Sequence, residues 1–102
     1  MCGIAGIYKK DDFELEIKIQ KMLSELHHRG PDERGYFVKE DFALGMTRLS
    51  IIDLSTGKQP ISSNDDRYHL VCNGEIYNYV ELKNKMIKKG YRFKTNSDVE
   101  VI

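Results

Sequence analysis

Small and apolar residues fill the start of the chain, and apolar residues at helical spacing follow. Residues 3–8 read Gly-Ile-Ala-Gly-Ile-Tyr, a run that predicts a buried strand against which another element packs closely. The polar residues 9–12 then supply N-cap candidates. A stripe at i, i+4, i+7, i+8 and i+11 predicts an amphipathic helix through Leu15, Ile19, Met22, Leu23 and Leu26. Gly30 and Pro31 end it, because Gly suits the position after a helix and Pro cannot continue one.

Alternating residues in the middle of the chain predict an antiparallel pair of strands. Residues 35–39 and 43–47 read as two strands around a turn at residues 39–41. A polar loop over residues 55–66 leads to a further predicted strand at residues 68–72.

The last third predicts two helix starts separated by a short strand. Asn78 and Glu81 resemble a capping box, and Gly90 ends the helix that follows. Its buried face would be Leu82, Met86 and Ile87, and its solvated face Lys83, Lys85, Lys88 and Lys89. Residues 91–94 alternate as a short strand, and residues 97–100 form a second capping-box pattern that places Asp98 near a positive helix end. A helix capped so close to Ile102 has no body to bury, so we expect the sequence to be the front portion of a longer protein.

Composition narrows the class of protein. The 102 residues make one small domain at most, and equal numbers of acidic and basic residues give zero net charge. A net charge of zero gives no electrostatic reason to expect binding to nucleic acid or to an anionic membrane. The sequence has neither an apolar run of membrane length nor a signal peptide. Two cysteines, Cys2 and Cys72, fit a reducing cytosol and predict a cytoplasmic protein. The adjacent His27 and His28 lack a ligand cluster at metal spacing, so no metal site is predicted.

Cys2 is the first candidate for chemistry. Once Met1 is removed, Cys2 carries both a thiol and a free α-amine, so nucleophile and base share one residue. Gly3 has no Cβ and lets a substrate lie close to the backbone. The alternative is that Cys2 is simply a small residue at the start of a buried strand.

Two further positions each allow a structural and a functional interpretation. Arg48 interrupts apolar surroundings and needs an anionic partner, which is either an internal carboxylate or the carboxylate of a ligand. Asn73-Gly74 is either a tight turn or a pair of donors, a side-chain amide and a backbone N–H, that converge on a developing oxyanion.

Four stretches in this order resemble a known family: M-C-G-I-A-G-I, H-R-G-P-D, R-L-S-I-I-D with N-G-E-I-Y-N, and S-D-V-E-V-I. Together they resemble the N-terminal glutaminase domain of class II glutamine amidotransferases, which are N-terminal-nucleophile hydrolases, and R-G-P-D and N-G-E-I-Y-N look like the asparagine synthetase branch. The implied fold is α+β, a four-layer αββα sandwich with antiparallel sheets. Residues 1–102 would be its first part, truncated at the C-terminal side.

The resemblance also implies roles for individual residues. Cys2 would attack the glutamine side-chain amide, its α-amine would act as base through water, and Asn73 with the Gly74 N–H would form the oxyanion hole. The glutamine head group would be held by Arg48 at its α-carboxylate and by Asp98 with Glu75 at its α-ammonium. Backbone groups would line the site at Leu49, Ser50, Ile51 and Ile52. Glu33-Arg34 departs from the family, which often has an aromatic or small residue there, and is expected to touch no proposed catalytic group.

The resemblance implies a larger protein as well. Ammonia would pass to an ATP-dependent synthetase domain of the same chain that makes asparagine from aspartate. ATP and Mg would belong to that missing domain, and this segment would need no cofactor. Two alternatives stay open: the same glutaminase chemistry serving another carboxylate such as a sugar acid, or a non-catalytic fragment that binds partners or forms a homodimer through unpaired sheet edges. We expect the isolated segment to be inactive or poorly folded on its own.

Overall fold

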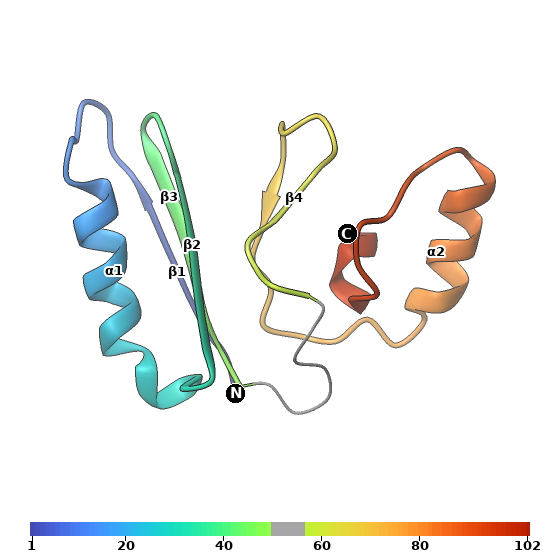
Figure 1. The fold of residues 1–102 in the computed structure, drawn as a ribbon, viewed down its shortest axis with the longest axis horizontal. Coiled ribbons are helices and arrows are strands. Elements are labelled where there is room, and N and C mark those ends of the chain that lie inside the picture. The colour runs from blue at the N-terminus through green and yellow to red at the C-terminus, as the bar shows by residue number, and fades with distance from the viewer. Residues whose placement is uncertain (50–56) are drawn as a thin grey trace.

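The computed structural model describes residues 1–49 and 57–102, which form helical and sheet layers side by side (Figure 1). The first layer is α1 (Leu15–Glu25), continued by a short 3-10 helix, η1 (His27–Arg29). The second is a sheet of β1 (Gly3–Tyr8), β2 (Glu33–Lys39) and β3 (Phe42–Arg48), and the third is a hairpin of β4 (Ile61–Ser62) and β5 (His69–Leu70). The fourth contains α2 (Tyr79–Lys88) and the 3-10 helix η2 (Asp98–Val101). This layer order confirms the predicted α+β class with antiparallel sheets.

The register of the first sheet determines which residues lie near the site. Its strand order is β1-β3-β2, and both pairings are antiparallel. Gly3 lies opposite Thr47 at one end of the β1–β3 pairing, and Glu33 lies opposite Arg48 at the same end of the β2–β3 pairing. The start of the chain, the start of β2 and the end of β3 therefore meet at one end of the sheet.

The apolar core lies between α1 and one face of this sheet. Its buried cluster is Ala5, Leu15, Ile19, Leu23 and Ala43. The predicted helix stripe is confirmed at Leu15, Ile19 and Leu23, whereas Met22 at its edge remains 38% exposed. Burial of the Leu and Ile side chains of this cluster stabilises the layer by roughly 1.5–3 kcal/mol each.

The β4–β5 hairpin packs against the opposite face of the sheet. The His69 ring stacks on Phe37 of β2 with 3.9 Å between ring centroids, and Phe42 of β3 lies 6.0 Å from the same ring. On β1, Ile4 is 50% exposed. The hairpin therefore covers the β2 side of this face and leaves the β1 side open.

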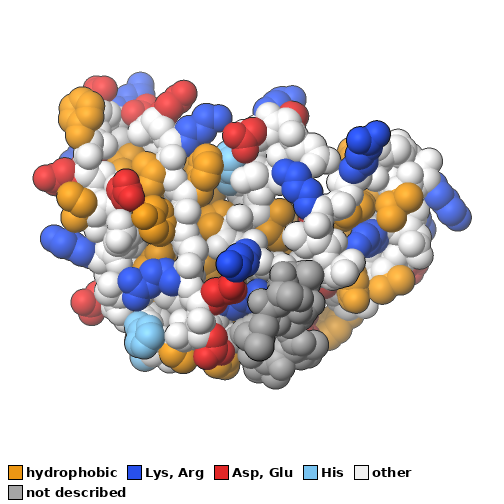
Figure 2. All heavy atoms as spheres, in the orientation of Figure 1, with side chains coloured by type: hydrophobic (Ala, Val, Ile, Leu, Met, Phe, Trp, Pro, Cys, Tyr) orange, Lys and Arg blue, Asp and Glu red, His pale blue; other side chains and the backbone are white. Residues whose placement is uncertain are grey.

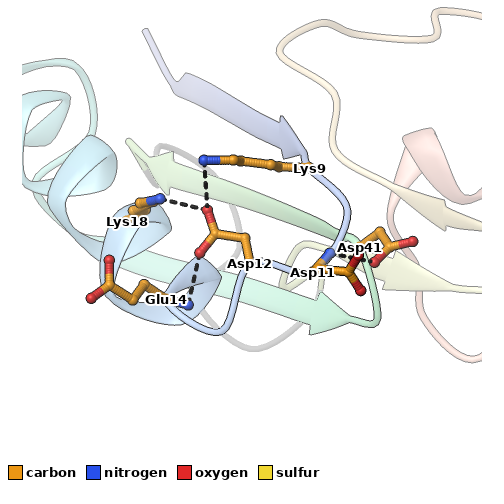
Figure 3. A network of polar contacts seen from close by, with 6 residues as sticks. All are labelled: Lys9, Asp11, Asp12, Glu14, Lys18 and Asp41. Atoms are coloured by element: carbon orange, nitrogen blue, oxygen red, sulfur yellow. Dashed lines mark hydrogen bonds and ion pairs between the residues drawn. The ribbon is translucent and has the colours of Figure 1, made fainter.

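A polar network fixes the loop between β1 and α1 (Figure 3). The Asp12 carboxylate accepts a 2.5 Å hydrogen bond from Lys18 and a 2.8 Å bond from the Glu14 N–H, and it also lies 3.7 Å from Lys9 Nζ. The hydrogen bond from Lys18, followed by the Glu14 N–H, lowers the pKa of Asp12 below its usual value. Asp12 therefore orders the loop before α1, whereas no side chain caps the helix itself, which begins at Leu15.

Several predicted elements in the second half of the chain are wrong in extent. The strand expected over residues 68–72 is limited to His69–Leu70, and residues 91–94 lie outside any strand. The helix α2 is present, and Gly90 follows it with a φ of +94°. None of its residues is fully buried, and Ile87 on the predicted buried face is 50% exposed. A short strand is stable only when it is paired within a sheet, and residues 91–94 pair with no described strand.

Neither predicted capping box forms. Asn78 precedes α2 without a side-chain capping bond, and Glu81 instead pairs with Lys85 one turn later at 2.8 Å. Among the charged side chains visible over the α2 end of the face seen in Figure 2, most are basic, and apolar side chains lie between them. The prediction that Lys83 is simply solvated is wrong, because its ammonium donates to the Thr95 carbonyl at 3.1 Å.

In place of the capping box predicted over residues 97–100, the Glu100 side chain binds the backbone of the preceding loop. Glu100 accepts backbone hydrogen bonds from Lys94 at 2.6 Å and Thr95 at 2.8 Å, so its carboxylate does not reach back to Ser97. Asp98–Val101 is consequently a four-residue 3-10 helix. In the described part of the chain no helix is long and apolar enough to cross a membrane.

Candidate active site

Cys2 and Arg48 lie at the same end of the first sheet. The β1–β3 pairing ends at Gly3 and Thr47, so the same antiparallel register continued by one residue places Cys2 opposite Arg48. Gly3 and Thr47 face Leu26, the residue that directly follows α1. Because side chains alternate along a strand, Cys2 and Arg48 lie on the opposite face of the sheet. Cys2 is half-buried, and its thiol is unpaired with the other cysteine.

The turn after α1 holds the backbone of both residues. Arg29 Nε donates to the Cys2 carbonyl at 3.2 Å, and the Asp32 N–H donates to the Arg48 carbonyl at 3.1 Å. Gly30 is not a left-handed helix terminator, because its φ is −154°. A Cβ there would lie 2.5 Å from the Arg48 nitrogen, so the residue is Gly because the turn passes so close to β3.

The Arg48 side chain has an internal carboxylate partner. Its Nη1 lies 3.3 Å from Glu33 Oε2, and the two residues are direct partners in the β2–β3 register. The interpretation of Arg48 as part of an internal salt bridge is therefore confirmed, and its ligand-binding role stays a prediction. Glu33 is expected from the sequence to touch no proposed catalytic group, and its ion pair is with Arg48, a residue predicted to bind substrate.

The segment after the undescribed residues approaches Arg48 from the other layer. Gly57 has a φ of +86°, and a Cβ built on it would lie 3.5 Å from Arg48 Nη2 and 3.2 Å from Ser97 Cβ. A larger residue would be strained there and would push these groups apart. Gly57 thus brings the Ser97-Asp98 segment close to Arg48.

Asp98 connects two of the predicted motifs. Its Oδ2 accepts a 2.7 Å hydrogen bond from the Ile76 N–H. Asp98 is half-buried, and the bond holds the N-G-E-I segment against η2. The carboxylate predicted to bind the glutamine ammonium therefore already has a backbone donor on one oxygen.

Asn73, Gly74 and Glu75 lie on the exposed segment between β5 and α2. A helix rather than a strand follows them, so Asn73-Gly74 does not join two strands of a hairpin, and Gly74 is a bend in the backbone. Within residues 1–49 and 57–102, no hydrogen bond joins Asn73 or Gly74 to Cys2. In Figure 1 this segment and the N-terminus lie at the same lower end of the molecule. The oxyanion-hole role of both residues stays a prediction.

The remaining predicted residues belong to the connection after β3. Leu49 directly follows Arg48 and is half-buried. Ser50, Ile51 and Ile52 lie outside the described residues. No group of His, Cys, Asp and Glu side chains in the described ranges could hold a metal ion.

The sequence interpretation missed the partners that hold the site in place. Glu33 could have been found from the register, because a hairpin that pairs Lys39 with Phe42 also pairs Glu33 with Arg48. From the sequence, Arg29 and Asp32 are expected to brace the turn after α1, but the contact of Arg29 with the Cys2 carbonyl has no sequence signal because it depends on the tertiary position of η1.

Comparison with known proteins gives a consistent result across the chain. The sequence model of the family described as "Glutamine amidotransferase domain" matches residues 1–102. The chain is 45% identical over 106 residues to the glutamine-hydrolysing asparagine synthetase 1 of Bacillus subtilis. It is 41% identical over 104 residues to the corresponding Zea mays protein and 38% identical over 104 residues to asparagine synthetase B of Escherichia coli.

These alignments use all of this chain but little of each relative. They cover 100% of the chain and 17%, 17% and 19% of the three relatives in turn. The chain therefore spans less than a fifth of the length of the curated relatives it matches.

Proposed function

We propose that this chain, which belongs to the glutamine amidotransferase domain family, hydrolyses the side-chain amide of glutamine with Cys2 as an N-terminal nucleophile. The observation that carries the proposal is the position of Cys2 at the start of β1 beside Arg48. This register puts the thiol and the Arg48 cation at the same end of the sheet, and the α-carboxylate of an amino-acid substrate needs such a cation.

The first chemical step is attack by Cys2 Sγ on the glutamine amide carbon. Removal of Met1 frees the Cys2 α-amine, which takes the thiol proton through a water molecule. The C–N bond then breaks as the amine returns the proton to the leaving nitrogen, giving ammonia and a γ-glutamyl thioester. Water attacks the thioester, the C–S bond breaks, and glutamate leaves with the thiol restored.

The other predicted residues bind charge that is present or develops. Arg48 holds the α-carboxylate of glutamine, and Asp98 with Glu75 holds its α-ammonium. Asn73 and the Gly74 N–H donate to the oxyanion of the tetrahedral intermediate, a contribution that is typically worth about 10²–10³ in rate per donor. Backbone groups of residues 49–52 line the site.

The whole protein transfers the ammonia to aspartate in an ATP-dependent synthetase domain of the same chain, producing asparagine. The names of the relatives support this acceptor, and their greater length supports a further domain. ATP and Mg act in that domain. The protein works in the cytoplasm.

The decisive experiment uses the full-length protein and measures ammonia release from glutamine, with and without ATP and aspartate. Cys2→Ala should abolish glutaminase activity but keep asparagine synthesis from added ammonia. Cys72→Ala is the matched control, because Cys72 is the other cysteine of this segment and is also half-buried, and it should remain active. Intact mass should show Met1 removed. A Cys2→Ala protein that still hydrolyses glutamine, or a fully active protein that keeps Met1, would contradict the mechanism.

A further inference from the structure

We propose that the Glu33 carboxylate competes with the α-carboxylate of glutamine for the Arg48 guanidinium and thereby weakens glutamine binding. This inference rests on the proposed function, because it assumes that Arg48 holds the substrate carboxylate. It adds a residue that sets the affinity of the site for glutamine and that the sequence motifs did not include.

The strand register fixes Glu33 beside Arg48. The two residues are opposite each other in the β2–β3 pairing, and their side chains lie on the same face of the sheet. Their side chains are 28% and 20% exposed, respectively. A partly buried guanidinium favours a nearby anion, and Glu33 supplies one whether or not glutamine is bound.

The contact between Glu33 and Arg48 is weak enough for a substrate carboxylate to take the place of Glu33. One oxygen of Glu33 meets one nitrogen of Arg48 at 3.3 Å, which is longer than the roughly 2.7–2.9 Å of a strong charge-assisted bond. A free carboxylate that binds the guanidinium through two parallel hydrogen bonds makes a stronger contact. When glutamine binds, Arg48 therefore exchanges its weak contact with Glu33 for a stronger contact with the α-carboxylate of glutamine.

Lys58 keeps the displaced carboxylate paired. Its ammonium lies 4.0 Å from the second oxygen of Glu33, and its side chain is 81% exposed and so able to follow a small movement. A cavity of about 70 Å³ beside the three residues provides room for the movement, and Gln59 and Met46 also line it. Lys58 thus lowers the cost of releasing Arg48.

The strand order places the reacting glutamine and Glu33 on different sides of Arg48. Because β3 lies between β1 and β2, Cys2 and Glu33 are on opposite sides of Arg48. A glutamine that reacts at Cys2 approaches the guanidinium from the β1 side, while Glu33 holds it from the β2 side.

The test measures glutamine hydrolysis by the full-length protein. Glu33→Gln keeps the shape of the side chain and removes its charge, so KM for glutamine should fall by about two- to fivefold, the effect expected of a partly exposed ion pair. The turnover number should stay within about twofold, since Glu33 touches no reacting atom. Glu81→Gln is the matched control, because Glu81 is also ion-paired but lies on α2, and its KM should not change. An unchanged or increased KM in Glu33→Gln would overturn the inference.

Two further variants separate competition from simple structural damage. Glu33→Asp keeps the charge but draws it back by one methylene, so it should also lower KM. Lys58→Met should raise KM in the wild-type background and have no effect when combined with Glu33→Gln. An equal effect of Lys58→Met in both backgrounds would mean that Lys58 acts on glutamine directly and would overturn the proposed exchange.

The two levels of the proposal fail in different ways. Loss of glutaminase activity in Cys2→Ala together with an unchanged KM in Glu33→Gln rejects only the competition by Glu33. Glutamine hydrolysis that survives in Cys2→Ala rejects the proposed function itself.

Discussion

The Asp98 carboxylate accepts a 2.7 Å hydrogen bond from the backbone N–H of Ile76, 22 residues earlier in the chain. This bond connects the η2 turn with the segment that carries Asn73 and Gly74. A residue predicted to bind the substrate ammonium therefore also holds the predicted oxyanion segment in place. Its two roles can be separated, because an amide retains a hydrogen-bond acceptor but not the charge.

We expect Asp98→Asn to raise KM for glutamine by about 10- to 100-fold, because a hydrogen bond to a charged partner contributes roughly 1.5–3 kcal/mol. The melting temperature should barely change, since the amide oxygen of the introduced side chain still accepts from the Ile76 N–H. Asp98→Ala, by contrast, should raise KM and lower the melting temperature. Steady-state kinetics and thermal unfolding of the full-length protein measure both effects, and an unchanged KM in Asp98→Asn would leave Asp98 with a structural role only.

Arg48→Lys should raise KM for glutamine by about tenfold or more although the charge is kept. A Lys ammonium cannot reproduce the planar pair of donors that binds a carboxylate. It should have little effect on ammonia-dependent asparagine synthesis in the full-length protein, which provides an internal control. If KM stayed the same, the function of Arg48 would be limited to its salt bridge with Glu33.

Asn73→Ala should lower the turnover number for glutamine by about 10²–10³ without abolishing it, because the Gly74 N–H still donates to the oxyanion. The matched control is Asn78→Ala. Asn78 lies on the same connection before α2 and makes no side-chain capping bond to that helix, so its replacement should leave turnover unchanged. A similar loss in both variants would point to disruption of the segment rather than to an oxyanion hole.

Asp12 should make the stability of the domain sensitive to acid. The Lys18 hydrogen bond lowers the pKa of Asp12 from its usual value, so the stabilising contribution of Asp12 is complete above the unfolded-state pKa of about 3.9 and is lost as pH falls through the lower folded-state pKa. Asp12→Asn should therefore melt at a lower temperature than wild type at pH 7, and the difference should shrink as pH falls below about 3.9.

The control for this measurement is Asp11→Asn in the same loop. Asp11 has a φ of 57°, a backbone conformation that Asn also adopts readily, and it contributes a backbone N–H to Asp41. Its replacement should change stability little at any pH. A difference between wild type and Asp12→Asn that persists undiminished in acid would show that shape, not charge, is responsible.

The sequence by itself determined the elements that bury one face in the apolar core between α1 and the first sheet. The strand at Gly3–Tyr8, the helix at Leu15–Glu25 and the β2–β3 hairpin follow from periodicities of two and 3.6 residues, since each has one face that must be buried. The predicted chemistry of Cys2 followed from its place beside the first residue.

Tertiary structure decided which polar groups meet. Glu33 reaches Arg48 through strand register, and Asp98 reaches Ile76 through the approach of two loops. The capping box expected at Ser97 was lost because the Glu100 carboxylate found two backbone donors at residues 94 and 95. Local patterns state what a polar side chain is able to bind, but its partner depends on which distant backbone the fold brings within about 3 Å of it.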